Sequence, residues 1–124
     1  MSKSSRSVFL FSIYMFGLGS IMVLLPNLLL NLFSVPETNE VWIRVAGMLV
    51  LILGYYYFQA SKNDIKVFFK WTVFARSSVV LFLIAFVLLG LAPPILILFG
   101  IVDAVAAYWT NYCLKADQKN KVYQ

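Results

Sequence analysis

Four long apolar stretches constrain this chain more than any other feature. They cover residues 8–25, 41–60, 66–91 and 94–114. A helix needs roughly 20 apolar residues to cross the hydrocarbon core of a bilayer. The composition agrees, because 62% of the 124 residues are hydrophobic and 12% are charged, whereas a soluble domain is about half apolar and a quarter charged. The sequence therefore predicts an all-α fold: a four-transmembrane-helix bundle that forms a single integral membrane domain over residues 1–124.

The ends of these stretches carry residues that begin or end helices. Pro26 follows the first stretch, and Pro93 and Pro94 precede the fourth, where a proline suits the first helical turn. Asp64 is predicted to cap the amino end of the third helix. The first stretch is longer than a signal-peptide core and has no A-x-A site after it, so we expect it to remain as a membrane anchor.

The positively charged residues predict the orientation of the chain. Lys and Arg in short loops mark the cytoplasmic side of a membrane. The loop of residues 27–40 has neither and carries Glu37 and Glu40, and the third loop is uncharged. Both termini and the second loop are therefore predicted to be cytoplasmic. Because the cations are spread over three segments, we interpret them as a topology signal; the alternative is a surface that docks to anionic lipid or to an acidic partner. We predict no nucleic-acid binding. The cations are Lys3, Arg6, Lys62, Lys66, Lys70, Lys115, Lys119 and Lys121.

The first outer loop is predicted to contain a short amphipathic helix. Asn27, Asn31 and Ser34 follow helical spacing, and the residues between them are leucines and a phenylalanine. Such a helix lies in the membrane interface with its apolar face in the lipid. It is expected to cap the mouth of the bundle, and the alternative is a lid over an entry site for a lipophilic ligand.

Three charged side chains fall inside the predicted spans. With about 1.5 Å of rise per residue, Arg44 lies about 6 Å, Asp103 about 15 Å and Arg76 about 22 Å below the outer surface. Charges at such depths usually face the interior of a bundle and pair with one another. We therefore predict an Arg44–Asp103–Arg76 cluster. It is either a structural element that fixes helix register or the polar anchor of a ligand site, to which Tyr55, Asn27 and Asn31 are candidate contributors.

Small residues recur at helical spacing on three of the spans. They allow membrane helices to approach closely, so that van der Waals contacts hold the helices together. We expect these faces to point into the bundle or toward another protomer, and the bulky aliphatic faces to meet lipid. The small residues are Ser12, Gly19 and Ser20 in the first span, Gly47 and Gly54 in the second, and Gly100, Ala106 and Ala107 in the fourth.

Several kinds of chemistry are excluded by composition. The chain has no histidine and one cysteine, Cys113, which excludes an intrachain disulfide, most metal sites and a Cys–His nucleophile. It also lacks the GxSxG, P-loop and HExxH motifs. We therefore predict no catalytic residues and no metal site, and these absences argue against a conventional hydrolase or a metalloenzyme.

The runs LPNLLLNLF, VWIRVAGMLVLILGYYYFQA, FFKWTVFARSSVV and GLAPPILILFGIVDA together resemble small uncharacterised four-helix bacterial membrane proteins, broadly DoxX-like. The residues that carry the resemblance are Arg44, Gly47, Gly54, the three consecutive tyrosines at 55–57, Arg76, Pro93 and Asp103. It implies a bacterial inner (cytoplasmic) membrane location, and DoxX-like proteins are linked to quinone-coupled oxidation. No redox motif accompanies it in this chain.

Together these observations favour a non-enzymatic accessory or scaffold subunit that packs against itself or another membrane protein within the lipid bilayer. The first alternative is a binder of a quinone or lipid through Arg44, Arg76 and Asp103. The second alternative is a small transporter or channel that uses Asp103 as its protonatable group. No cofactor is predicted for the scaffold, and a quinone is the candidate for the binder.

Overall fold

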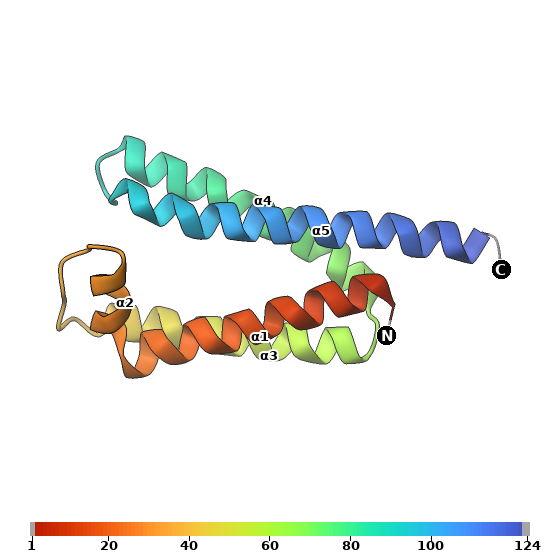
Figure 1. Cartoon of the computed structure of the whole chain (residues 1–124), viewed down its shortest axis with the longest axis horizontal. Coiled ribbons are helices and arrows are strands. Elements are labelled where there is room, and N and C mark those ends of the chain that lie inside the picture. Colours follow the sequence, from red (N-terminus) through yellow and green to blue (C-terminus); the bar gives the residue numbers. More distant parts are fainter. Residues whose placement is uncertain (1, 123–124) are drawn as a thin grey trace. The chain divides into compact units, whose positions relative to one another are not determined.

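A computed structural model describes residues 2–122, with side chains described through Lys119, and all of its regular structure is helical (Figure 1). The all-α prediction is confirmed: four helices are long and apolar enough to cross a membrane, so the chain is a multi-pass membrane protein. The predicted helix in the first loop is also present. The elements are α1 (Lys3–Leu24), α2 (Pro26–Leu32), α3 (Trp42–Lys62), α4 (Lys66–Leu88), the 3-10 turn η1 (Pro94–Leu96) and α5 (Ile97–Val122).

Helix α1 begins at Lys3, earlier than the apolar stretch predicted. The first N–H groups of a helix have no partner within it. Here the Asp117 carboxylate accepts hydrogen bonds from the N–H groups of Lys3 and Ser4, at 3.2 and 3.1 Å. The Ser2 hydroxyl accepts from the N–H of Ser5 at 3.1 Å. These acceptors satisfy the exposed end of the helix, so it extends beyond its apolar residues.

Three helices end in the same way, with a residue of positive φ just after the last turn. Gly90 has a φ of 76° after α4, Asp64 has a φ of 51° after α3, and Ser34 has a φ of 56° after α2, so Ser34 lies beyond the loop helix rather than on it. In each, the next residue donates to a carbonyl five positions earlier: Leu91 to Phe86 at 2.9 Å, Ile65 to Ala60 at 3.1 Å, and Val35 to Leu30 at 2.8 Å. This pattern is the Schellman ending of a helix. The predicted cap role of Asp64 is therefore wrong: it terminates α3, and α4 has no side-chain cap.

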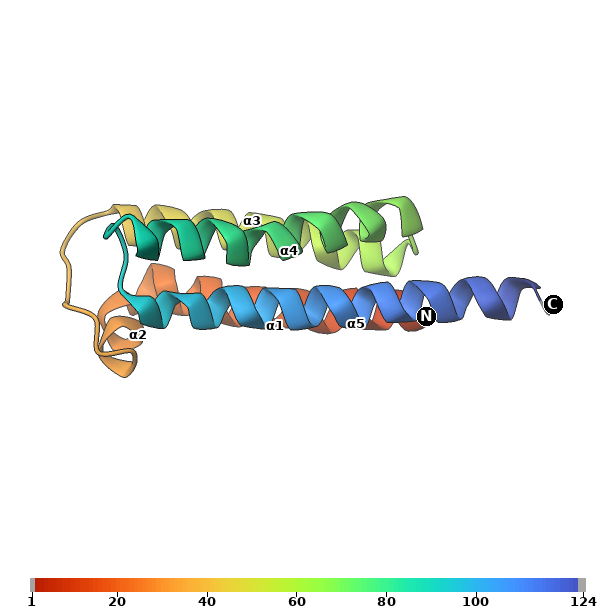
Figure 2. The ribbon, with the colours of Figure 1, turned by 90° about the horizontal axis from the view of Figure 1, so that it is seen from above.

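The chain divides into two compact units, each of which is described by itself. We call residues 9–59 the α1–α3 unit; it holds most of α1, all of α2 and most of α3. We call residues 1–8 with 60–124 the α4–α5 unit; it holds the start of α1, the end of α3, and the α4–η1–α5 hairpin. Figure 2 shows α2 with the loop that leads from it to α3.

Close contact between two glycines holds the α1–α3 unit together. A Cβ atom built on Gly19 would lie 2.9 Å from the carbonyl oxygen of Gly47, and one built on Gly47 would lie 3.0 Å from that of Gly19. At this point the backbones approach more closely than any side chain would allow, as expected where membrane helices pack through small residues. Nearer the second loop the packing is aromatic, with Phe9 and Phe16 both against Phe58 at ring-centroid distances of 5.7 and 6.2 Å.

In the α4–α5 unit, the hairpin also closes on a glycine. Gly100 of α5 is buried, and a Cβ built on it would lie 2.8 Å from the Cα of Val80 on α4. Farther along α5, Ala107 and Thr110 are fully buried. The small-residue face predicted for the fourth span is thus the packed side of α5 at these positions. Pro94 begins the turn that leads into α5, as the sequence predicts.

Candidate functional site

Arg76 is held inside the α4–α5 unit by two threonines. Its side chain is 3% exposed. The Nη2 atom donates to the hydroxyls of Thr72 on α4, at 3.1 Å, and of Thr110 on α5, at 2.9 Å. The Nε atom donates to the Thr72 carbonyl at 3.3 Å. Burial of a guanidinium is costly unless its donors find acceptors, and the bonds of Nη2 and Nε supply acceptors that join α4 to α5 at the position of the charge.

The contacts of Arg76 continue to the start of α1. The Thr110 hydroxyl lies 2.9 Å from that of Ser7, which donates to the Ser4 carbonyl at 2.8 Å. Ser4, Ser7 and Thr110 are all buried. A line of hydrogen-bonding groups therefore runs along the packed side of the unit from the start of α1 to Arg76.

Asp103 lies on α5, two turns before Thr110, and is partly buried. Arg76 is the charged group that acts on it electrostatically. The structure thus brings these two predicted site residues within electrostatic range of each other. Arg44 belongs to the other unit, so the three-residue cluster stays a prediction.

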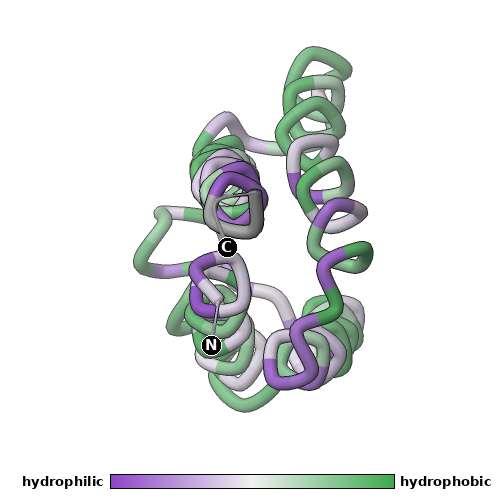
Figure 3. Tube along the Cα trace, turned by 90° about the vertical axis from the view of Figure 1, so that its right-hand side faces the viewer, coloured by the Kyte–Doolittle hydropathy of each residue, from purple (hydrophilic) through white to green (hydrophobic). Residues whose placement is uncertain are grey.

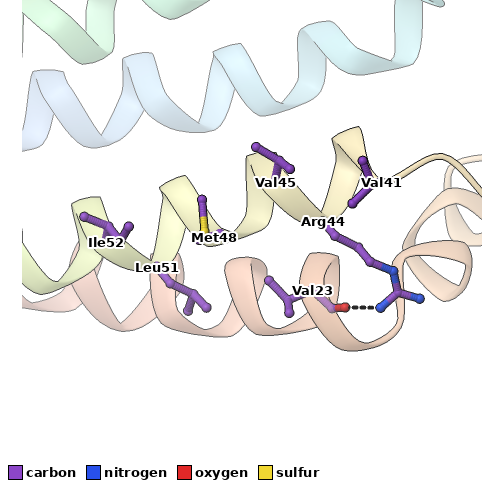
Figure 4. Close-up of a pocket in the computed structure, with 7 residues that line it drawn as sticks. All are labelled: Val23, Val41, Arg44, Val45, Met48, Leu51 and Ile52. Carbon is purple, nitrogen blue, oxygen red and sulfur yellow. Dashed lines mark hydrogen bonds between the residues drawn. The ribbon is translucent and has the colours of Figure 1, made fainter.

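Arg44 contacts the end of α1 in the α1–α3 unit. Its Nη1 atom donates to the carbonyl oxygen of Val23, one residue before α1 ends (Figure 4). The last carbonyls of a helix lack partners and carry partial negative charge, so an arginine there stabilises the helix end. Arg44 also lines an open groove of about 480 Å³, whose other walls are apolar: Val23, Val41, Val45, Met48, Leu51 and Ile52.

The two predicted asparagines tie the first loop to α2. The Asn27 side-chain oxygen accepts from the N–H of Thr38 at 3.0 Å, and the Asn31 amide donates to Glu37 at 2.9 Å. Both bonds fold the loop back over α2. Each asparagine has a structural partner in the loop, and neither is among the residues that line the groove at Arg44.

The three consecutive tyrosines face different sides of α3. Tyr57 is buried and packs against Phe11, with the rings tilted and their centroids 5.7 Å apart. Tyr55 is 54% exposed and lies against Tyr56 at 6.0 Å. The tyrosine that enters the packed interior is therefore Tyr57, which the sequence did not single out.

A cluster at the start of α1 was not predicted from the sequence; we call it the serine–aspartate cluster. The Ser4 hydroxyl donates to Asp117 at 2.6 Å, and the Ser5 hydroxyl donates to Asp64 at 2.6 Å. The Lys66 ammonium lies 3.1 Å from Asp117 and 3.6 Å from Asp64. The run SKSSRS at residues 2–7 was the available signal, because serines that precede a span can bond to carboxylates on neighbouring segments. The cluster consists of Ser2, Ser4, Ser5, Asp64, Lys66 and Asp117.

Asp64 is the member of the cluster that lies between spans. Partial burial opposes the charged form of its carboxyl group. The hydrogen bonds from Ser5 and Ser2 and the charge of Lys66 outweigh that effect, so the pKa of Asp64 lies below its ordinary value. Asp64 is therefore ionised at neutral pH and holds the start of α1 to the turn between α3 and α4.

Comparisons with protein-family models, with curated proteins and with solved structures find no match for this chain. The resemblance to DoxX-like proteins stays a prediction. Within the part of the chain that the structure describes, no three His, Cys, Asp or Glu side chains gather where they could hold a metal ion.

Proposed function

We propose that this protein is a non-enzymatic membrane subunit that acts by packing its helices against another helix, from a second copy or from a different membrane protein. The observation that carries the proposal is that Arg76 has a structural role in helix packing. Its guanidinium bonds to Thr72 and Thr110 across the α4–α5 hairpin, inside the packed protein. A charged side chain used in this way strengthens the contact between its own two helices.

The surface of α5 supports the same proposal. An open groove of about 430 Å³ runs along one side of this helix and contains no charged residue. In a bilayer such a surface meets either lipid or another helix, and Ala106, the small residue in its lining, is the point at which a second helix can approach closely. The groove is lined by Ile101, Val102, Val105, Ala106 and Trp109.

For location, we propose a bacterial inner membrane with both termini in the cytoplasm. The contacts of Asp64 and Asp117 with Ser4 and Ser5 support this topology, because they hold the start of α1, the turn before α4 and the last turns of α5 at one end of the α4–α5 unit. These are the segments that carry the cations, and cations in short loops favour the cytoplasmic side.

Native mass spectrometry of protein extracted in mild detergent tests the packing proposal. A dimer, or a complex with another membrane protein, is expected. Ala106→Trp fills the α5 groove and is expected to break that association, whereas Ala85→Trp, at an exposed position on α4, leaves it intact. A wild-type chain that is monomeric and free of protein partners under these conditions contradicts the proposal.

A second candidate function is supported by the groove at Arg44. An apolar groove with one cation at its rim suits a lipophilic molecule with an anionic or oxygen-rich head, such as a lipid or a quinone. The same mass spectra test this candidate. A bound molecule of a few hundred daltons that is lost in Met48→Trp, which fills the groove, is the supporting result; its retention in that variant contradicts the candidate.

A further inference from the structure

The cations that the sequence spreads over three segments come together at one end of the α4–α5 unit. Ser5 and Ser2 at the start of α1 bond to Asp64, next to the end of α3, at 2.6 and 2.7 Å. Ser4 bonds to Asp117, near the end of α5, at 2.6 Å. Figure 3 shows hydrophilic residues of these three segments at the end of the chain nearest the viewer. The cations are far apart in the sequence, which favoured their interpretation as a topology signal, but in the fold they lie together at one end of this unit.

The two acidic residues at this end are both used within the protein. Asp117 accepts from the N–H groups of Lys3 and Ser4, from the Ser4 hydroxyl and from Lys66. Asp64 accepts from Ser2 and Ser5 and lies 3.6 Å from Lys66. The negative charges are thus directed toward the start of α1 and toward one partly buried lysine.

The other cations of these segments are exposed on the outside of the same end. Lys66 contacts both Asp64 and Asp117, and among the residues whose side chains are described the cations of these segments outnumber those two carboxylates by seven to two. This end therefore presents a surplus of positive charge to its surroundings. We call the exposed cations the basic end; its members are Lys3, Arg6, Lys62, Lys70, Lys115 and Lys119.

Exposed aromatic residues place the basic end at the edge of the membrane. Trp71 follows Lys70 in the chain and is 65% exposed, and Tyr112 lies one turn before Lys115 and is also 65% exposed. Tryptophan and tyrosine prefer the headgroup level of a bilayer. Their position beside the lysines puts the ammonium groups at the depth of lipid phosphates.

We propose that the basic end binds anionic phospholipid headgroups, with ammonium and guanidinium groups on the lipid phosphates and Trp71 and Tyr112 against the adjoining acyl chains. The proposal is independent of the packing function and of the groove at Arg44. A lipid is favoured over an acidic protein because the cations adjoin exposed aromatic residues on spans that lipid surrounds. Each cation that a headgroup meets is expected to raise the preference for anionic lipid by about fivefold.

Quenching of Trp71 fluorescence by brominated lipids tests this proposal. The double variant Trp42→Phe/Trp109→Phe leaves Trp71 as the only tryptophan. It is reconstituted into vesicles of phosphatidylcholine that contain a fixed fraction of brominated phosphatidylglycerol or, in parallel, of brominated phosphatidylcholine. Stronger quenching by the brominated anionic lipid is expected, because that lipid is enriched beside Trp71. Equal quenching by the two lipids would overturn the proposal.

Two further arms connect the preference to the cations. Lys70→Gln/Lys115→Gln/Lys119→Gln in the same background is expected to weaken it, and an undiminished preference in the folded triple variant would overturn the proposal. Raising the salt concentration from 0.1 to 1 M shortens the screening length from about 10 to about 3 Å. Higher salt is therefore also expected to weaken the preference for anionic lipid in the protein that keeps all of its cations. The control, Trp71→Phe/Trp109→Phe, retains only Trp42 in the α1–α3 unit, where no preference is expected; an equal preference there would overturn a site at the basic end.

Discussion

Replacing Gly19 with alanine is expected to destabilise the contact between α1 and α3. The added Cβ would lie 2.8 Å from Cγ of Leu51 and 2.9 Å from the carbonyl oxygen of Gly47. Neither neighbour is the end of a flexible side chain, so the helices must separate to make room. Overpacking of this kind costs about 1–3 kcal/mol, and the better helix propensity of alanine returns about 0.5–1 kcal/mol. The net expectation is a loss of about 1 kcal/mol, within limits of about 0 and about 2.5 kcal/mol.

Gly17 provides the matched control on the same helix. A Cβ at this position meets nothing within 4 Å, so Gly17→Ala keeps only the gain in helix propensity. The two variants add the same methyl group two residues apart and are expected to change stability in opposite directions. Reversible unfolding in mixed detergent–SDS micelles, followed by circular dichroism, measures both. If Gly19→Ala proves as stable as Gly17→Ala, the close packing of α1 on α3 at this glycine is refuted.

Three further predictions concern the polar groups. Thr110→Val removes the hydroxyl that Arg76 and Ser7 share, and it is expected to cost about 1–3 kcal/mol in the same unfolding assay, because buried donors lose their acceptor; Thr110→Ser keeps the hydroxyl, so equal losses in both variants contradict the role of the bond. Asp103→Asn removes the charge on which Arg76 acts and is expected to lower the melting temperature in detergent; an unchanged value argues against the pair. Asp64→Asn is expected to destabilise the protein at pH 7. Because the folded pKa of Asp64 is lowered, its stabilising effect is complete above the unfolded value of about 4 and is lost as the pH falls through the folded value. The difference in stability between wild type and Asp64→Asn should therefore shrink below pH 4, and a difference that does not change with pH contradicts this assignment.

The helical architecture could be predicted from the sequence because a bilayer imposes one requirement on every span. Apolar runs of about 20 residues must be helices, since backbone groups in lipid have no other partner. The ends of the helices depend on different interactions. Helix α1 begins at Lys3 because Asp117, more than a hundred residues away in the chain, accepts its first N–H groups. Helix α3 is terminated by Asp64, whose backbone is in the left-handed conformation, although the sequence pattern predicts this residue as the start of α4. Such long-range and backbone effects leave no local pattern.

The candidate site was predictable to a similar degree. Arg76 and Asp103 stand out because charges are rare in spans, and the fold places them within electrostatic range of each other. The partner Thr72 lies four residues before Arg76, so helical spacing alone indicates that contact. The serine–aspartate cluster joins residues from three distant segments. Ordinary polar residues at the end of a span have many alternatives in water, so only the fold selects these partners.

The proposed topology places the start of α1, the turn before α4 and the end of α5 on the cytoplasmic side of the membrane, and the loops at Pro36 and Leu91 on the opposite side. Single cysteines in a Cys113→Ser background test it through labelling with a membrane-impermeant maleimide in intact cells. Pro36→Cys and Leu91→Cys are at exposed positions and are expected to react. Gln118→Cys, also exposed, is expected to react only after the membrane is permeabilised. Labelling of Gln118→Cys in intact cells, or protection of Pro36→Cys, would contradict the account.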